Sequence, residues 1–160
     1  MKNTLKILIL FAFISNSLFA YEMKNVDIYL KKCDYGNPAA CTIVGDFYSV
    51  GGEDFVKDMN KSIKFWTKAC DLGETIACMR GGTFCAINRN LPNYEAKAKR
   101  FFKKYLDLNI GFCNWGNAKS CRDVGAFYSI GLGVEIDMEK AKIFFQKGCD
   151  NGDKDSCESL

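Results

Sequence analysis

Apolar residues recur at helical spacing in two segments that align with each other without gaps. In residues 57–70 and 136–149 the apolar positions are Ile63, Phe65, Trp66 and Ala69 in the first copy and Ala141, Ile143, Phe144, Phe145 and Gly148 in the second. An aspartate before each run, Asp58 or Asp137, is placed to accept hydrogen bonds from the first free N–H groups of a helix. Both segments are therefore predicted to be helices with one apolar face.

Residues 41–52, 78–89 and 121–134 form a second set of aligned segments. Val44-Gly45 and Val124-Gly125 are each followed by a tyrosine three residues after the glycine, Tyr48 or Tyr128. Glycine lets two helix backbones approach, and we expect the tyrosine ring to fill the space beside them. The pattern predicts a close helix–helix crossing at each glycine.

The first twenty residues have the pattern of a secretory signal peptide. Lys2 and Lys6 precede an apolar run over residues 7–14, and Leu-Phe-Ala at 18–20 offers a cleavage site before Tyr21. A helix of eight residues rises about 12 Å, whereas the hydrocarbon core of a membrane is roughly 30 Å thick. The alternative is an uncleaved anchor, but polar residues 15–17 interrupt the run. We expect an exported chain, periplasmic or secreted, with no stable membrane span after cleavage.

Charge and composition narrow the function. Without Lys2 and Lys6 the chain has 20 basic and 19 acidic side chains, so it has no general field to attract nucleic acid. It contains no histidine, the commonest general base and metal ligand. Residues 21–160 are enough for one domain with a core of its own.

Eight of the nine cysteines form four pairs with the same spacing, C-[DN]-x-G-x-x-x-[AS]-C. The pairs are Cys33 and Cys41, Cys70 and Cys78, Cys113 and Cys121, and Cys149 and Cys157. On one helix, residues eight apart would lie about 12 Å apart, beyond the roughly 7 Å that a disulfide can bridge. The chain must therefore turn within each pair, and the glycine three residues after each first cysteine allows it to do so. We predict four local disulfides, each closing a corner between two helices. Metal binding is the alternative, but the close cysteine pairs and histidines of zinc sites are missing.

The distances between pairs, 37, 43 and 36 residues, are typical of a repeat array. Residues 124–141, VGAFYSIGLGVEIDMEKA, resemble the Sel1-like repeat, and the cysteine pair at each corner resembles the Helicobacter cysteine-rich protein (Hcp) family. The resemblance covers residues 26–156. It implies an all-α fold, an α/α superhelical solenoid of antiparallel helix pairs with a concave groove. We place the repeats at about 38–73, 75–116 and 118–152, with short caps at both ends.

The middle repeat departs from this pattern. Cys85 occupies the tyrosine position, residues 88–93 form an irregular loop, and the second helix, from about Tyr94, is longer by about two turns. Phe101, Phe102, Tyr105 and Leu108 are expected to pack inward.

Known catalytic motifs are absent, and we predict neither a cofactor nor a bound metal. The resembled family is described as binding penicillins and hydrolysing β-lactams weakly, so a weak β-lactamase is the alternative function. The motif sets of serine β-lactamases do not occur, and a zinc enzyme would need histidine ligands. We therefore expect a monomeric module that binds a protein or peptide, rather than an efficient enzyme.

The candidate groove is assigned to exposed positions on the first helix of each pair. These residues are Thr42, Asp46, Ser49, Met79, Thr83, Arg122 and Ser129, with Ala86 and Ala126 at equivalent positions. They suit an extended peptide, and equally an ordinary solvated helix face. A basic stretch on the long helix (Lys97, Lys99, Arg100, Lys103 and Lys104) fits an acidic partner or, more simply, a solvated face.

Two further residues carry specific predictions. Cys85 is predicted to be a free, buried thiol; the alternative is an exposed thiol that pairs with another chain. Asn60 lies in Asp58-Met59-Asn60-Lys61-Ser62, which fits the extended acceptor sequence of bacterial N-glycosylation. The alternative is that Asp58 caps a helix and Asn60 lies in its first turn.

Overall fold

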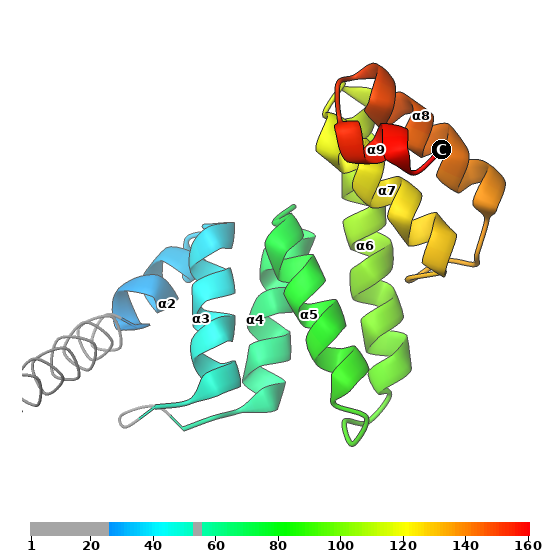
Figure 1. The fold of residues 1–160 in the computed structure, drawn as a ribbon. Coiled ribbons are helices and arrows are strands. Elements are labelled where there is room, and N and C mark those ends of the chain that lie inside the picture. The colour runs from blue at the N-terminus through cyan, green and yellow to red at the C-terminus, as the bar shows by residue number, and fades with distance from the viewer. Residues whose placement is uncertain (1–25, 53–55) are drawn as a thin grey trace, which may run out of the picture. The chain divides into compact units, whose positions relative to one another are not determined.

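A computed structural model describes residues 26–52 and 56–160, which form eight α-helices. They are α2 (Val26–Asp34), α3 (Pro38–Val50), α4 (Met59–Asp71), α5 (Thr75–Ile87), α6 (Tyr94–Asn114), α7 (Ala118–Ile130), α8 (Met138–Asp150) and α9 (Lys154–Glu158) (Figure 1). The all-helical fold class is confirmed. The proposed signal peptide lies outside the described residues. Within the described ranges, no helix is both long and apolar enough to cross a bilayer.

The same corner is built four times, and its hydrogen bonds explain the cysteine spacing. The glycines of the four motifs, Gly36, Gly73, Gly116 and Gly152, have φ of 85°, 93°, 87° and 94°, the left-handed conformation that ends helices. The backbone N–H of the next residue donates to the carbonyl five residues earlier, as from Asn117 to Phe112 at 3.0 Å. The same Asn117 then caps the following helix, because its side chain accepts from the Ser120 N–H at 2.9 Å.

A disulfide closes each corner. Cys33–Cys41, Cys70–Cys78, Cys113–Cys121 and Cys149–Cys157 have Cα–Cα distances of 4.6, 4.8, 4.6 and 4.7 Å. On a chain-entropy model, loops of this size stabilise by roughly 2.5 kcal/mol each. The corners therefore follow from three local requirements, which are a glycine, a capping residue and two cysteines eight residues apart.

The described chain divides into two compact units, residues up to Phe65 and residues from Trp66 onward. In the first unit, α2 packs on α3, and the Tyr48 ring of α3 stacks on Phe65 of α4 with 5.6 Å between centroids. Lys61 lies over the Tyr48 ring at 4.9 Å, and Asp58 caps α4 by accepting from the Lys61 N–H at 2.9 Å. These contacts fix the start of α4 against the end of α3.

The second unit repeats this arrangement. Tyr128 of α7 stacks on Phe144 of α8 at 5.9 Å, Lys140 lies over the Tyr128 ring, and Asp137 caps α8 by accepting from the Lys140 N–H. Both tyrosines are half-buried rather than deep in the core. The expectation that a tyrosine fills the space beside the glycine is wrong at Gly125. There the ring of Phe145 occupies that space, 2.7 Å from where a Cβ would lie.

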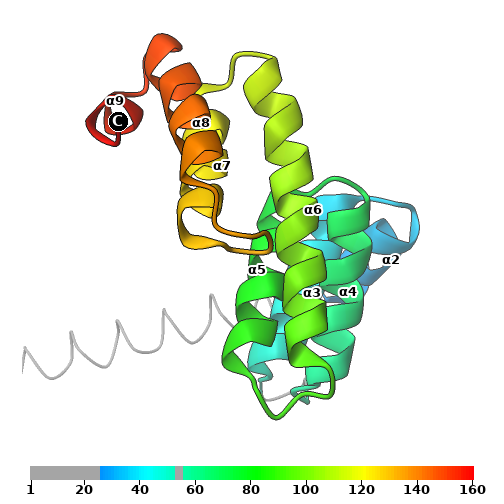
Figure 2. The same cartoon turned by 90° about the vertical axis from the view of Figure 1, so that its right-hand side faces the viewer.

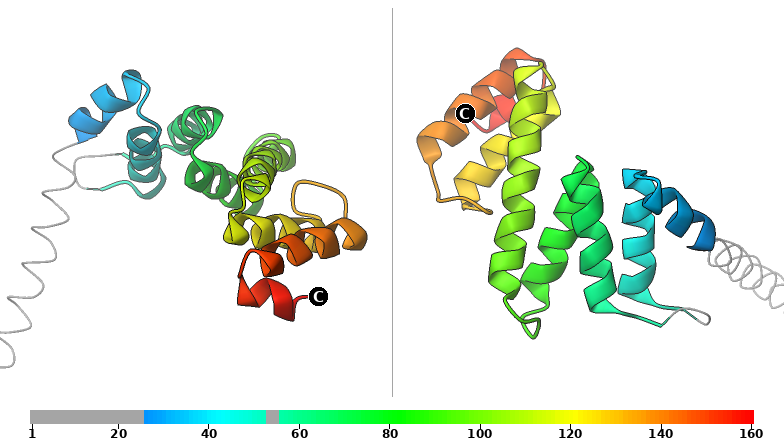
Figure 3. Two further views of the ribbon diagram at one scale, coloured as in Figure 1. Left: turned by 90° about the horizontal axis from the view of Figure 1, so that it is seen from above. Right: turned by 180° about the vertical axis from the view of Figure 1, so that it is seen from behind.

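Within the second unit, the long helix α6 packs against both α5 and α7. It has 21 residues, whereas α4 and α8 have 13 each. Helix α5 lies along the N-terminal half of α6, α7 packs against α6 from the other side of the corner, and α8 packs on α7 (Figures 2 and 3). Phe101, Phe102 and Tyr105 are buried as predicted, but Leu108 is only half-buried. Leu106, two residues earlier, is buried instead.

Candidate functional site

The second unit contains a groove formed where the start of α5, the C-terminal half of α6 and the start of α7 meet. Its volume is about 570 Å³. Its walls and floor are formed by Thr75, Ile76, Met79 and Arg80 of α5, Tyr105, Asn109 and Phe112 of α6, and Asn117, Lys119, Ser120 and Asp123 at and after the next corner. The two extra turns carry α6 past the start of α5, and α7 packs against these turns (Figure 1). The groove is thus a consequence of the long helix in the middle repeat.

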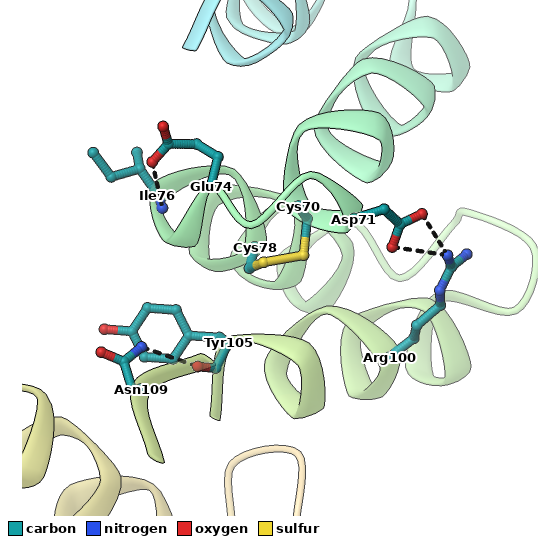
Figure 4. The surroundings of a disulfide bond; sticks show 8 residues. All are labelled: Cys70, Asp71, Glu74, Ile76, Cys78, Arg100, Tyr105 and Asn109. Carbon is teal, nitrogen blue, oxygen red and sulfur yellow. Dashed lines mark hydrogen bonds and ion pairs between the residues drawn. A yellow bond between two sulfur atoms is a disulfide. The ribbon is translucent and has the colours of Figure 1, made fainter. Parts of the chain in front are cut away.

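The floor of the groove is held by side-chain hydrogen bonds. The Tyr105 hydroxyl donates to Asp123 Oδ2 at 2.7 Å, and the Asn109 amide donates to the Tyr105 carbonyl at 2.9 Å. The Tyr105 ring stacks on Phe127 of α7 with 4.9 Å between centroids. Figure 4 shows Tyr105 and Asn109 side by side, opposite Glu74 and Ile76 at the start of α5. The floor is therefore tied to α7 by a hydrogen bond and a ring contact.

The protonation state of Tyr105 follows from this arrangement. Burial, followed by the hydrogen bond to Asp123, raises the pKa of Tyr105 far above its usual value. The phenol therefore remains a hydrogen-bond donor at neutral pH and is not poised to act as a base.

Several large apolar side chains at the groove are exposed. Ile76 is 55% exposed and Phe112 is 44% exposed, although both line the groove. Trp115 is 92% exposed and lies between Phe112 and Asn117 in the chain. Exposed aromatic residues beside a concave surface are typical of protein-binding sites.

A second cavity, of about 390 Å³, lies at the other end of α5. Ala86 and Arg89 line it together with Tyr94, Glu95 and residues of the α7–α8 loop. The Tyr94 hydroxyl already donates to Glu95 at 2.9 Å.

The structure brings only one of the seven predicted groove residues into the groove. Met79 lines it, whereas Thr83 is exposed elsewhere on α5. Arg122 is half-buried and forms ion pairs with Asp153, at 3.0 Å, and with Asp155, which attach α7 to the C-terminal segment. Ser129 is half-buried, and its hydroxyl donates to the Ala126 carbonyl.

In the first unit the exposed position predicted for Thr42 is wrong. Thr42 is only 6% exposed, and its hydroxyl donates to the Pro38 carbonyl at 3.1 Å. Asp46 and Ser49 are half-buried, and the Ser49 hydroxyl donates to the Asp46 carbonyl at 2.7 Å. On α3 the rotation of the helix about its axis therefore differs from the expected one at Thr42, whereas Thr83 and Ala86 of α5 are exposed as expected.

The groove residues of α6 were not predicted as a site. Tyr105, Asn109 and Phe112 follow an i, i+4, i+7 spacing, which places them on one face of α6. An asparagine inside an otherwise apolar stripe was the available signal, since a buried amide needs partners. Asn109 is 5% exposed and has such a partner in the Tyr105 carbonyl.

The basic stretch of α6 is partly neutralised. Arg100 forms an ion pair with Asp71 of α4 at 3.0 Å (Figure 4), and Lys103 pairs with Asp107 at 3.1 Å. Both pairs are exposed, so each contributes at most about 1 kcal/mol. These contacts favour the interpretation of a solvated helix face.

Cys85 and Asn60 are placed clearly. Cys85 is a free cysteine with 0% exposure, and burial raises the pKa of its thiol. Asn60 is exposed in the first turn of α4, next to a helix cap formed by Asp58. Ser62 is fully buried, and its hydroxyl donates to the Asp58 carbonyl at 3.0 Å. Among residues 26–52 and 56–160, no three histidine, cysteine or acidic side chains are grouped to hold a metal ion.

The corners, the alternating helix pairs and the stacked repeats define an α/α repeat solenoid. Two segments of the chain, residues 38–74 and 118–153, match the Sel1 repeat family model. No curated protein sequence matches the chain significantly.

Solved structures share the fold. A Sel1 repeat protein from Oxalobacter formigenes is 24% identical with a TM-score of 0.56; the match covers 84% of this chain and 52% of that one. Cysteine-rich protein B of Helicobacter pylori is 22% identical with a TM-score of 0.53, covering 87% and 94%. A protective antigen of uropathogenic Escherichia coli that displays an SLR fold is 23% identical with a TM-score of 0.51, covering 79% and 25%. The chain thus spans about half of the first of these relatives and a quarter of the third.

Proposed function

We propose that this protein is a Sel1-like repeat scaffold that binds another protein or a peptide in the α5–α6–α7 groove. The observation that carries the proposal is the groove itself, about 570 Å³ in volume, with a hydrogen-bonded floor and exposed Ile76 and Phe112 at its sides. Concave surfaces with a few fixed polar groups and apolar walls are typical binding sites. The fold supports a scaffold, because stacked repeats present extended surfaces to partners.

We also propose that the protein is exported and that it is a cysteine-rich Sel1-like repeat protein of the Hcp type. The amino-terminal pattern over residues 1–20 and four corner disulfides both suit an oxidising compartment outside the cytoplasm. We place residues 21–160 in one monomeric array of three repeats, with the middle repeat at about 75–116 diverged from the matched model. The corner disulfides, together with the likeness to cysteine-rich protein B, support assignment to the Hcp type.

Site-specific photocrosslinking tests the binding surface. A photoreactive amino acid is introduced at Met79, which lines the groove, or at Thr83, which is exposed one turn away on the same helix. In cells of the native host, irradiation is expected to yield a discrete crosslinked species from position 79 and not from position 83. Met79→Lys in the protein carrying an affinity tag is expected to lose the same partner.

Equal crosslinking from both positions, or recovery of the partner with Met79→Lys, would show that the groove is not the binding surface. Fractionation of the same cells, with sequencing of the amino terminus, tests export separately. A chain that begins at Tyr21 in the envelope or the medium is the expected result. A full-length cytoplasmic chain contradicts it.

A further inference from the structure

The last of the four corner disulfides differs from the other three in its exposure. The six cysteines of the first three corners are at most 3% exposed. At the last corner Cys157 is exposed and Cys149 is half-buried, although their Cα–Cα distance of 4.7 Å lies within the range of 4.6–4.8 Å at the other corners. A thiolate attacks a disulfide only where it can reach a sulfur atom. The Cys149–Cys157 bridge therefore offers an external thiol a point of attack in the folded protein.

The helix that follows each corner explains this difference. Helices α3, α5 and α7 follow the first three corners and have 13 residues each, whereas α9 follows the last corner and has five (Figure 1). Helix α7 packs on both α6 and α8, and its Cys121 is 0% exposed. Helix α9 packs mainly on α8. Cys157 on α9 thus lacks the cover that Cys121 has on α7.

A small set of contacts besides the bridge attaches α9 to the rest of the second unit. Arg122 of α7 forms ion pairs with Asp153, which caps α9, at 3.0 Å and with Asp155 in the first turn of α9. Ser156 is fully buried and lies against Gly148 of α8, where a side chain would have no room. A helix of five residues is not stable alone in water, so α9 depends on these contacts and on the bridge.

We propose that the Cys149–Cys157 bridge is a thiol-exchange site and that its opening releases α9 from α8. The reaction partner is a protein dithiol. Its first thiolate bonds to the Cys157 sulfur, and Cys149 leaves as a thiolate that takes up a proton. The second thiolate of the partner then displaces Cys157, so that the partner is oxidised to a disulfide while Cys149 and Cys157 are reduced to two thiols. The inference is independent of the α5–α6–α7 groove.

Opening this bridge leaves the other helices of the unit in place. The rings of Tyr128 and Phe144 still join α7 to α8, and their centroids are 5.9 Å apart. The free thiol of Cys85 is 0% exposed, so it does not compete for the newly formed thiols. The change is therefore confined to the segment after α8, and it uncovers Gly148 and the Arg122 guanidinium.

Limited reduction of the purified, disulfide-bonded protein tests the exchange site. Dithiothreitol, a small dithiol, is added at low concentration, and samples are blocked with N-ethylmaleimide and mapped by mass spectrometry. We expect Cys149 and Cys157 to become labelled together, at least about tenfold faster than the cysteines of any other corner, with an unchanged circular dichroism spectrum. The Cys113–Cys121 bridge, with the same spacing, is the matched reference. Equal rates at these two corners, or loss of helical signal before the first label, would overturn the proposal.

Glutathione, a monothiol, tests which sulfur is attacked. It cannot complete the second step alone, so the first product is a mixed disulfide. In samples blocked at once with N-ethylmaleimide, glutathione is expected on Cys157 and the maleimide on Cys149, because Cys157 is the more exposed of the two. Glutathione spread evenly over the four corners would refute a selective site.

Hydrogen exchange of residues 151–160 measures the release of α9. Exchange there is expected to be about tenfold faster after reduction, and equally fast without reductant in the double variant Cys149→Ser/Cys157→Ser. Arg122→Gln is expected to change this exchange little while the bridge is closed and to accelerate it further once the bridge is open. Lys142→Gln, which removes a charge from the exposed face of α8, is the control and should have no effect in either state. If residues 151–160 exchange equally fast in the oxidised and reduced protein, the bridge does not hold α9 and the proposal fails.

Discussion

Gly82 of α5 is a position where a single added methyl group is expected to clash with a buried aromatic ring. A Cβ at Gly82 would lie 2.5 Å from Cε1 and 2.6 Å from Cδ1 of Phe102. Carbon atoms in favourable contact are about 3.5–4.0 Å apart, so the ring would have to move by about 1 Å. Phe102 is only 5% exposed, and Gly133 of the α7–α8 loop lies close to its Cβ. The ring is therefore confined.

The expected magnitude follows from two opposing effects. Overpacking a filled core costs about 1–3 kcal/mol, whereas alanine stabilises a helix by about 1 kcal/mol relative to glycine. Gly82→Ala is thus expected to lower the free energy of unfolding by about 0–2 kcal/mol. Gly111→Ala is the matched control, because it lies within α6 and a Cβ there meets no atom within 4 Å. That variant is expected to be more stable by about 0.5–1 kcal/mol.

Urea unfolding followed by circular dichroism, with the disulfides intact, measures both changes. The difference in the free energy of unfolding between Gly111→Ala and Gly82→Ala decides the test, and we expect it to be about 1–3 kcal/mol. A second variant tests the cause. Phe102→Leu replaces the ring with a smaller side chain, so Gly82→Ala should lower the free energy of unfolding by less in that background. If Gly82→Ala is as stable as Gly111→Ala, the close packing of α5 on α6 is not as described and the reasoning fails.

Four other expectations concern covalent chemistry and activity. Non-reducing peptide mapping should find only the four bridges within the corner motifs; any bridge between motifs contradicts the corner geometry. Without reductant, Cys85 should react with a thiol reagent only after denaturation, since it is fully buried and its pKa is raised; rapid labelling of native protein, or a dimer lost in Cys85→Ser, would refute burial. The native protein should carry no glycan on Asn60, because Asp58 caps the helix and Ser62 is buried; an intact mass above that of the bare disulfide-bonded chain would show otherwise. Purified protein should not turn over a chromogenic cephalosporin at about 1 s⁻¹ or faster, a rate typical of enzymes, and such a rate would establish the alternative activity.

The corners and helix boundaries could be predicted because they depend on neighbours in the chain. The start of the long helix at Tyr94, the loop before it and the four glycine turns all match the sequence prediction. Caps such as Asp137 act within three residues, so one chain segment contains all the information needed.

The faces of the inner helices could not be predicted in the same way. Helix α3 has apolar residues on most of its sides, so periodicity does not fix its rotation, and Thr42 turned inward. On α7, Arg122 was drawn away from the expected groove by two carboxylates more than thirty residues later in the chain. Such contacts are set by the packing of distant segments, which a local pattern does not contain.

The order of the cysteines also bears on how the chain matures. A polypeptide that emerges amino terminus first and is oxidised as it appears will join each cysteine to the next one available. This rule gives Cys33–Cys41 and Cys70–Cys78 correctly, but it would then join Cys85 to Cys113. Cys85 is buried in the finished fold. Burial raises the pKa of its thiol, and the positive charge of Lys97 on α6 opposes that rise. If α6 docks on α5 before Cys113 meets an oxidant, this thiol is already hidden and the wrong bridge does not form; otherwise a Cys85–Cys113 bridge has to be rearranged by thiol–disulfide exchange. Correct pairing of the last two corners thus depends on the order in which folding and oxidation occur along the chain.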